Sequence, residues 1–328
     1  MRDHTILFSL GFAATIIGVA VYQVIATRFG IVALPNERTL HAKATVRGGG
    51  IVIALVFLAG VVVLFAQDEL PVRWFMALFI GGVVISGVGF VDDIVHLGTR
   101  SRLVIHFVLG CWAVLWIGDL QLDLPAMLVF PVAVLSVMWT INLFNFMDGI
   151  DGMAASGSTY FCVAAVCLLE SSSELRAPIL LLGLASAGFL VFNWPPARLF
   201  MGDSGSGFYG YTFAVLILAS VASGHLSLWT WIILLAYFLG DTTTTLMIRL
   251  ATVPNPLGTH RSHAYQNLAR VWNDHRRMTL SALALQLGWM LPLAIASVAW
   301  PSLGLVLAAV ALTPPVLLAV KYGPRYGR

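Results

Sequence analysis

Long apolar runs, repeated from one end of the chain to the other, constrain the fold of this 328-residue sequence more than any other feature. A helix needs about 20 apolar residues to cross the hydrocarbon core of a bilayer. Only 10% of the residues are charged, against about 25% in an average soluble domain. We therefore predict an all-α, polytopic integral membrane helical bundle. The runs lie at residues 5–27, 49–66, 73–91, 103–118, 125–144, 154–169, 177–193, 207–222, 228–250, 279–297 and 302–320.

The lysines and arginines indicate the orientation of the chain. We expect 10 or 11 transmembrane helices in a single domain over residues 1–328, and eleven spans place the termini on opposite sides. With the N-terminus outside, Arg2, Arg73 and Arg176 lie on the outer face and the remainder of the 18 basic residues face the cytoplasm. Cytoplasmic loops carry such an excess of positive charge. We therefore predict an outer N-terminus and a cytoplasmic C-terminus, with no soluble domain left over to bind nucleic acid.

Carboxylates gather in three successive cytoplasmic connections. Asp92 and Asp93 end the third span in "GFVDDI", Asp148 and Asp151 follow the fifth in "NLFNFMDGID", and Asp203 follows the seventh in "FMGDSGSG". Each acid could be a helix cap, since aspartate followed by small residues is common there. Their neighbours are apolar residues and glycines, however, and glycine lets a backbone approach a ligand and leaves amide groups free. We therefore predict that these acids converge on a ligand.

Five carboxylates at one membrane edge would repel one another, and loss of solvent makes their anionic forms costlier still. Either some are protonated or a cation is bound. Oxygen ligands favour a hard cation, and Mg²⁺, with Mn²⁺ as the alternative, is usual where a phosphate completes the shell. Basic residues on the same side, each by itself typical of a positive-inside anchor, together indicate a polyanion such as a diphosphate. They are Arg38, His41, Lys43, Arg47, Arg100, Arg102, Arg198, Arg249, His260, Arg261 and His263.

Six motifs, in order along most of the chain, carry a family resemblance. They read "LHAKATVRGGG", "GFVDDI", "NLFNFMDGIDGMA", "FNWPPARLFMGDSGS", "LGDTTTTLMIRL" and "HRSHAYQNL". Together they resemble the polyprenyl-phosphate N-acetylhexosamine-1-phosphate transferases of glycosyltransferase family 4, closest to the branch that initiates O-antigen synthesis on undecaprenyl phosphate. The resemblance implies a helical bundle in the bacterial inner membrane with a cytoplasmic cleft. There a UDP-N-acetylhexosamine gives its sugar 1-phosphate to the lipid phosphate and releases UMP, and relatives also occur as homodimers.

The resemblance also implies roles for residues that match its motifs. The metal ligand is Asp203, with Asp148 as a second ligand. The active-site loops lie near residues 30–48, 92–102, 142–153, 194–207 and 251–278. Catalytic roles at the lipid phosphate, the metal-bound diphosphate and the last loop fall to Asp92, Asp93, Asp148, Asp151 and His263. Substrate contacts fall to Asn142, Asn145, Asn193, Lys43, Arg47, Arg261 and His260.

One departure from the family pattern concerns the sugar. Many relatives end the last long cytoplasmic loop with "DRxHxHH", where this chain has "HRSHAYQ". Arg261 and His263 match, but His260 stands at the usual aspartate, and Tyr265 and Gln266 replace histidines. The less polar Tyr265 is a candidate to accept a methyl group, which would suit a 6-deoxy N-acetylhexosamine.

The mechanism and two rival functions stay open from the sequence. We expect the lipid phosphate to attack the sugar-linked phosphorus directly, with Asp92 as the usual choice of base; a covalent phospho-aspartate is the other route. Within the family, an enzyme that accepts a UDP-N-acetylmuramoyl-pentapeptide is the alternative, and the missing histidines argue against it. From another class, a cation-coupled transporter would need acids deep in the spans and repeat symmetry. Only Asp241 lies well within a predicted span.

Overall fold

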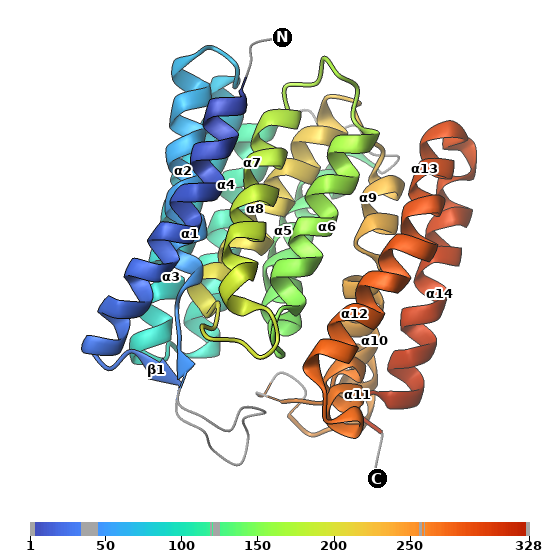
Figure 1. The fold of residues 1–328 in the computed structure, drawn as a ribbon. Coiled ribbons are helices and arrows are strands. Elements are labelled where there is room, and N and C mark those ends of the chain that lie inside the picture. Colours follow the sequence, from blue (N-terminus) through green and yellow to red (C-terminus); the bar gives the residue numbers. More distant parts are fainter. Residues whose placement is uncertain are drawn as a thin grey trace.

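Helices make up nearly all of the structure (Figure 1). The computed structural model describes residues 4–33, 45–118, 120, 125–255, 258 and 260–325. In chain order the helices are α1 (Thr5–Arg28), α2 (Gly50–Ala66), α3 (Val72–Val95), α4 (Thr99–Ile117), α5 (Ala126–Met147), α6 (Met153–Leu168), α7 (Arg176–Asn193), α8 (Asp203–Ala222), α9 (Leu228–Leu234), α10 (Ala236–Thr252), α11 (Ala264–Trp272), α12 (His275–Leu285), the π-helical turn η1 (Gln286–Met290), α13 (Leu291–Ala299), the 3₁₀ turn η2 (Pro301–Leu303) and α14 (Gly304–Tyr322). Two short strands, β1 (Val32–Ala33) and β2 (Thr45–Val46), pair antiparallel.

Every predicted apolar run is helical, although the run at 228–250 is divided between α9 and α10 and the run at 279–297 among α12, η1 and α13. Within the described residues, 8 helical segments are long and apolar enough to cross a membrane. Helices α9 and α10 meet at a bend of 81° and count as a ninth if they form one broken span, while α2 and α6 are apolar but shorter. The multi-pass all-α class is thus confirmed. The number of eleven spans and the orientation in the membrane stay predictions.

Several helices extend beyond the predicted ends of their spans, and three of them do so at polar motifs. Helix α3 continues to Val95 instead of residue 91, α5 continues to Met147 instead of residue 144, and α8 begins at Asp203 instead of residue 207. An apolar run ends at the first polar side chain, whereas a helix continues because its own backbone hydrogen bonds are satisfied within it. The polar motifs therefore lie on helix ends as well as in the loops between them.

Helix α8 occupies the centre of the bundle, packed between α3 and α5 (Figure 1). Nearly all of its residues are buried. At Gly210 an added Cβ would lie 2.4 Å from Ile141 Cα of α5, and at Gly89 of α3 it would lie 2.4 Å from the Asp203 carbonyl oxygen. Small residues permit such close helix packing in membranes. The N-terminus of α8 is therefore fixed against both neighbouring helices.

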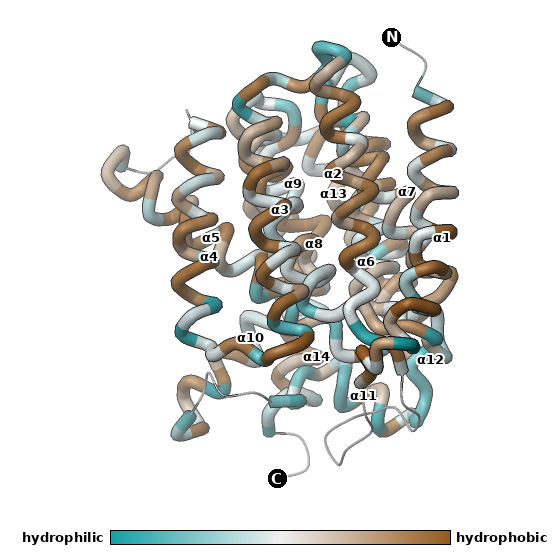
Figure 2. The backbone as a smooth tube through the Cα atoms, turned by 90° about the vertical axis from the view of Figure 1, so that its left-hand side faces the viewer, coloured by the Kyte–Doolittle hydropathy of each residue, from teal (hydrophilic) through white to brown (hydrophobic). Residues whose placement is uncertain are grey.

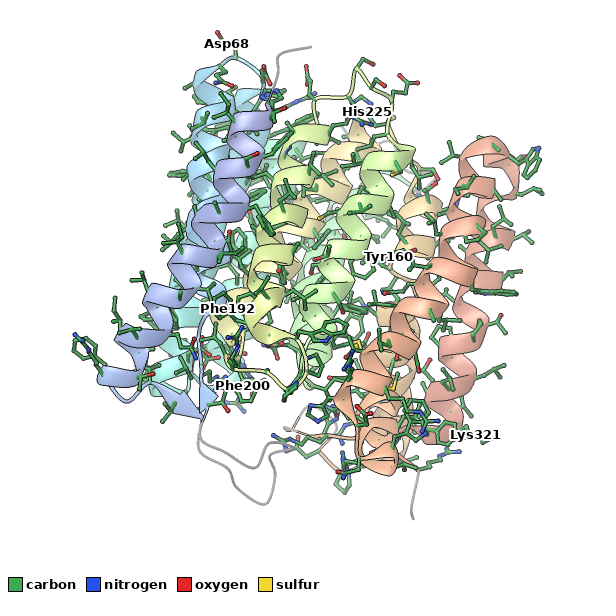
Figure 3. All side chains as sticks on the ribbon, in the orientation of Figure 1. Asp68, Tyr160, Phe192, Phe200, His225 and Lys321 are labelled. Carbon is green, nitrogen blue, oxygen red and sulfur yellow. The ribbon has the colours of Figure 1, made fainter. Side chains whose placement is uncertain are left out.

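The two ends of the bundle are distinct. Figure 2 shows apolar residues along the middle of the helices and hydrophilic segments at the ends, notably around α11 and α12. We call this end, where α3 and α5 finish and α8 begins, the site end. Figure 3 places Phe200 and Lys321 there, and Asp68 and His225 at the opposite end. The first connection and the segment before α8 meet at the site end, since Val46 forms a β-bridge with Leu199.

Candidate active site

Asp93 fixes the N-terminus of α8. Its Oδ1 accepts a hydrogen bond from Asp203 N at 2.9 Å, and its Oδ2 accepts one from Ser204 N at 3.1 Å. A carboxylate at this position satisfies free amide groups and is favoured by the helix dipole. Gly202 has a φ of +76°, and an added Cβ there would lie 2.5 Å from an Asp93 carboxylate oxygen. Glycine is therefore required where α8 begins.

Arg47 bridges two of the predicted acids. Its Nε lies 2.9 Å from Asp93 Oδ1, and its Nη2 lies 3.0 Å from Asp203 Oδ2. Tyr22 donates a hydrogen bond to the Arg47 carbonyl oxygen at 2.8 Å. Burial alone would lower the pKa of Arg47, but the carboxylates of Asp203 and Asp93 raise it above its usual value. The guanidinium thus stays charged at the start of α8.

Two cavities adjoin at this arginine. The larger, the polar cavity, has a volume of about 710 Å³, and its lining includes Asp93, Asp148, Asp151, Asn193, Phe200 and His275. The second, the apolar cavity, has about 610 Å³ and lies among Ile85, Val88, Leu97, Leu103, Ile141 and Leu246, with Asp92, Arg102 and Asn142. Both are lined by Arg47, Asn145, Asp203, Arg261 and Gln266. The predicted site residues that the structure describes therefore line one continuous region with a polar and an apolar side.

Asp203 and Asp148 are candidate ligands for a cation. Asn145 Nδ2 donates to Asp203 Oδ1 at 2.6 Å. The Asp148 carboxylate forms neither a hydrogen bond nor an ion pair with any described residue, and burial together with the charge of Asp203 raises its pKa well above the usual value. The described residues contain no cluster of three acidic, histidine or cysteine side chains that could hold a metal unaided. Two carboxylates completed by phosphate and water oxygens nevertheless suit Mg²⁺.

Asp151 and Asn193 build the wall of the polar cavity. Asp151 Oδ2 accepts a hydrogen bond from Ala197 N at 3.0 Å, and its Oδ1 lies 3.4 Å from His275 Nδ1. The buried Asn193 accepts a hydrogen bond from Gly152 N at 3.1 Å, so it holds the turn between α5 and α6 against α7. These contacts place both residues at the cavity, but their polar atoms are engaged with the protein.

The adjacent acids Asp92 and Asp93 make different contacts. Asp92 Oδ2 pairs with Arg102 Nη1 at 3.1 Å beside the apolar cavity, and its Oδ1 accepts from Leu97 N at 2.5 Å. Asn142, on the same cavity, has its Nδ2 3.5 Å from His106 Nδ1. Of the two acids, only Asp92 lines the apolar cavity, while Asp93 lines the polar cavity and accepts hydrogen bonds from the first amides of α8.

The last loop brings its histidines to the apolar cavity. The rings of His260 and His263 stack with centroids 5.0 Å apart, and Phe146 lies against both. Burial and the neighbouring His263 lower the pKa of His260 to about 3. Burial and His263 therefore favour the neutral form of the His260 ring.

Tyr265 has a different role from the predicted one. Its side chain is fully buried and lines neither cavity. Its hydroxyl donates to the Phe146 carbonyl oxygen at 2.6 Å and accepts from Gly149 N at 2.9 Å. The prediction that Tyr265 meets a sugar methyl group is therefore wrong. The ring instead fixes the backbone on either side of Asp148.

Some predicted residues lie outside this picture, and others were missed. Lys43, Arg38 and His41 lie outside the described residues. His275 beside Asp151 was missed, because only tertiary packing brings α12 to the α5–α6 turn. Asp241 was noted only as an acid within a span. The sequence could have indicated a role for it, since an acid in an apolar helix is energetically costly unless it has polar partners.

The fold and the site define a multi-pass membrane protein with a charged centre between a polar and an apolar cavity. The model of glycosyl transferase family 4 matches residues 75–221. A Bacillus subtilis relative, named a probable undecaprenyl-phosphate N-acetylglucosaminyl 1-phosphate transferase, is 28% identical over 84% of this chain and 80% of its own. The chain is therefore similar to relatives whose names describe polyprenyl-phosphate N-acetylglucosamine-1-phosphate transferases.

Two further relatives show the breadth of the similarity. The decaprenyl-phosphate N-acetylglucosaminephosphotransferase of Mycolicibacterium smegmatis is 28% identical over 79% of this chain and 73% of its own. A phospho-N-acetylmuramoyl-pentapeptide-transferase of Fervidobacterium nodosum is 30% identical over 54% of this chain and 60% of its own. The similarity to the first type of enzyme extends over more of the chain.

Proposed function

We propose that this protein transfers an N-acetylhexosamine 1-phosphate, with N-acetylglucosamine as the first candidate sugar, from a UDP-sugar to undecaprenyl phosphate and releases UMP. The observation that carries the proposal is the shared wall of the two cavities at Arg47, Asn145 and Asp203. A nucleotide cannot enter a bilayer and a polyprenyl chain cannot leave it. Their phosphates can therefore meet only where a polar and an apolar cavity adjoin.

The polar cavity suits the nucleotide sugar. Its wall carries carboxylates and amides on short, fixed turns, and the guanidinium of Arg47 stands at its inner end. Arg261 lines this cavity and the apolar one. Arginine donates in a planar fork that matches phosphate oxygens, so the two arginines can hold a diphosphate across the shared wall.

The apolar cavity suits the end of a polyprenyl phosphate. Aliphatic side chains of α3, α4, α5 and α10 line it, and the Asp92–Arg102 pair lies among them. Arg102 is the cation placed to meet the lipid phosphate, and Asp92 holds its guanidinium in place. Asp92 is thus better suited to positioning the arginine than to removing a proton.

The reaction we propose is a direct displacement. An oxygen of the lipid phosphate forms a bond to the sugar-linked phosphorus, and the bond from that phosphorus to the bridging oxygen breaks, so that the bridging oxygen leaves with UMP. A phosphate monoester has a second pKa of about 6, so the attacking oxygen is largely ionised at neutral pH. The protein must chiefly align two anions and offset their charge.

Asp203 and Asp148 would hold Mg²⁺, with Mn²⁺ as a substitute. The ion, when bound, would neutralise charge on the diphosphate. Asn145 orients the Asp203 carboxylate through its 2.6 Å hydrogen bond, and Tyr265 fixes the backbone at Asp148. The covalent route would need a free carboxylate as nucleophile, and of the five acids Asp148 is the one without a partner among the described residues.

The biological setting follows from the acceptor. We place the protein in the bacterial inner membrane with the site end in the cytoplasm, where it would begin an envelope polysaccharide of the O-antigen type. A phospho-N-acetylmuramoyl-pentapeptide transferase is the second candidate, because relatives of that name also match. It is less favoured because the loop bearing His260 and His263 lacks the histidine run of that branch.

The test is UMP release from purified full-length protein in detergent, with undecaprenyl phosphate and MgCl₂. The donors are UDP-N-acetylglucosamine, UDP-N-acetylgalactosamine, a 6-deoxy UDP-N-acetylhexosamine and UDP-N-acetylmuramoyl-pentapeptide. We expect lipid-dependent release with the first donor that EDTA abolishes and excess MgCl₂ restores. Release with the pentapeptide donor alone would favour the second candidate, and release that does not require the lipid would contradict the proposal.

A further inference from the structure

We propose that Asp241 is a positioning residue for His263, which it holds so that Nε2 faces the phosphate groups at the apolar cavity. This inference rests on the proposed function. Asp241 lies in α10 and lines neither the polar nor the apolar cavity. It would therefore act only through the histidine.

The contacts of Asp241 fix both the ring and its proton. His263 Nδ1 lies 3.2 Å from Asp241 Oδ1, with both side chains almost completely buried. The same carboxylate accepts hydrogen bonds from Ala264 N at 3.1 Å and Tyr265 N at 3.0 Å. A carboxylate surrounded by donors acts as an acceptor, so the ring proton belongs on Nδ1. Nε2 is then the atom available for a ligand.

His263 Nε2 is buried and has no hydrogen-bond partner among the described residues. The ring lines the apolar cavity, and its faces meet His260 and Phe146, which leaves the ring edges for a ligand. A buried polar atom without a partner is costly and calls for an explanation. A bound phosphate supplies one.

The chemistry of the pair suits an anionic ligand. With the Nδ1 proton held by Asp241, a proton gained at Nε2 makes this atom a donor to a phosphate oxygen. The Asp241 carboxylate offsets the positive charge of the imidazolium, as in other aspartate–histidine pairs. His260 remains neutral beside it, so the charge on His263 meets little repulsion from its stacked neighbour.

The rival explanation is structural, because Asp241 also binds the first amides of α11. A double-mutant cycle separates the two roles. We would measure kcat and KM for UMP release in Asp241→Asn, His263→Ala and the double variant. If Asp241 acts through the ring, Asp241→Asn lowers kcat by about 10–100-fold in the wild-type background and by less than about 3-fold in the His263→Ala background. A loss of similar size in both backgrounds would overturn the inference.

Thr245→Val is the matched control. Thr245 donates to the same Asp241 oxygen at 3.1 Å, one helical turn away, but does not touch the histidine ring. We expect its kcat to stay within about 3-fold of wild type, since it removes one ordinary hydrogen bond. Thermal unfolding of every variant shows whether a loss of activity is a loss of fold. A Thr245→Val loss as large as that of Asp241→Asn would point to the structural role.

A second measurement does not depend on activity. Nitrogen-15 NMR of protein labelled at its 8 histidines distinguishes the two ring tautomers, and the His263 signal is assigned by its loss in His263→Ala. We expect a ring protonated at Nδ1 whose signals shift in Asp241→Asn. A neutral ring protonated at Nε2 alone, or signals unchanged by Asp241→Asn, would overturn the inference. If the wild type releases no UMP, the proposed function fails, while this tautomer result still decides how Asp241 holds His263.

Discussion

Both ends of the bundle carry a cavity with acidic residues, yet only one of them is built as a site. The cavity at the opposite end has about 920 Å³, more than either cavity at the site end, and is lined by His4, Asp68, Glu69, Glu174 and Arg176 among others. Within it, His4 Nε2 lies 2.5 Å from Glu69 Oε2, and both side chains are part-exposed. At the site end, by contrast, Asp93 is bound by two backbone amides and one arginine.

The comparison shows that volume and negative charge do not by themselves indicate function. Preorganised groups stabilise developing charge because they need not rearrange during the reaction. At the site end, Asp203 is fixed by helix packing, an asparagine and an arginine, whereas the acids of the opposite cavity lie on the loops between α2 and α3 and between α6 and α7. Substitutions matched between the two ends test this distinction.

The largest effect is expected from Asp203→Asn. The change keeps the size of the side chain but removes the charge that pairs with Arg47 and would bind the cation. We expect kcat for UMP release to fall by at least about 10²–10³-fold, the scale of losing one transition-state contact. Thermal unfolding in the same detergent checks the fold, and activity within about 3-fold of wild type would remove Asp203 from the mechanism.

The next effect is expected from Arg47→Gln. Truncating one partner of a hydrogen-bonded charge pair costs about 2–5 kcal/mol, largely because the other charge is left unpaired. Two carboxylates, Asp93 and Asp203, would lose their shared cation here. We expect kcat to fall by about 10–100-fold and the thermal midpoint to fall as well. Arg47→Lys should recover part of the stability, because it keeps the positive charge. The recovery should be incomplete, because one ammonium group cannot bind both acids as the planar guanidinium does.

Sequence patterns predicted the helices well, because apolar runs in a membrane protein reflect one dominant constraint. Every run was helical. The bend of 81° between α9 and α10 was not predicted, since the run at 228–250 is apolar on both sides of the break. The helix ends were placed too early at α3 and α5, where polar side chains near the site interrupt the apolar pattern but not the helix.

The sequence predicted which residues belong to the site, but not what each of them does there. Acids flanked by glycine indicated that Asp148 and Asp203 approach a common ligand, and the structure places both at the polar cavity. From the same pattern, Asp92 and Asp93 were predicted to act as one pair. They instead face different partners, because successive residues of a helix point about 100° apart. The task of Tyr265 depends on packing between α11 and α5, which no local pattern in the sequence reports.

Two glycines with similar positive φ angles provide the next matched pair. Gly202 at the site end has a φ of +76° and Gly224 at the opposite end a φ of +70°. An alanine Cβ at Gly202 would meet the Asp93 carboxylate, while nothing lies within 4 Å of one at Gly224. Backbone strain alone costs about 1–2 kcal/mol, and overpacking adds about 1–3 kcal/mol. We expect Gly202→Ala to unfold at a lower temperature than Gly224→Ala and to lose about 10-fold or more in kcat.

The control for this pair is the activity of Gly224→Ala. It should match wild type, because its strain lies at the opposite end from the polar and apolar cavities. Equal losses of kcat in the two variants would show that the start of α8 is no more constrained than a loop at the opposite end.

A smaller effect is expected from Tyr265→Phe. The ring stays buried, but Phe146 O and Gly149 N lose their common partner. An unsatisfied buried polar group costs about 1–3 kcal/mol, and part of this cost can be relieved by water from the polar cavity at Gly149. We expect kcat/KM to fall by about 3–10-fold, with a small fall in the thermal midpoint. No change in kcat/KM would mean that the backbone at Asp148 is held without the hydroxyl.

The smallest effect is expected from Glu69→Gln at the opposite end. The side chains of Glu69 and His4 are 22% and 16% exposed, and their contact links a loop to the start of α1. Ion pairs reached by solvent contribute about 0–1 kcal/mol and weaken with salt. We expect kcat to stay within about 2-fold of wild type. We also expect a small shift of the thermal midpoint that becomes smaller when NaCl is raised from 50 to 500 mM, because the Debye length then falls from about 14 to about 4 Å. A 10-fold loss of kcat would instead show that the larger cavity is coupled to the reaction, and the contrast between the two ends would then have to be abandoned.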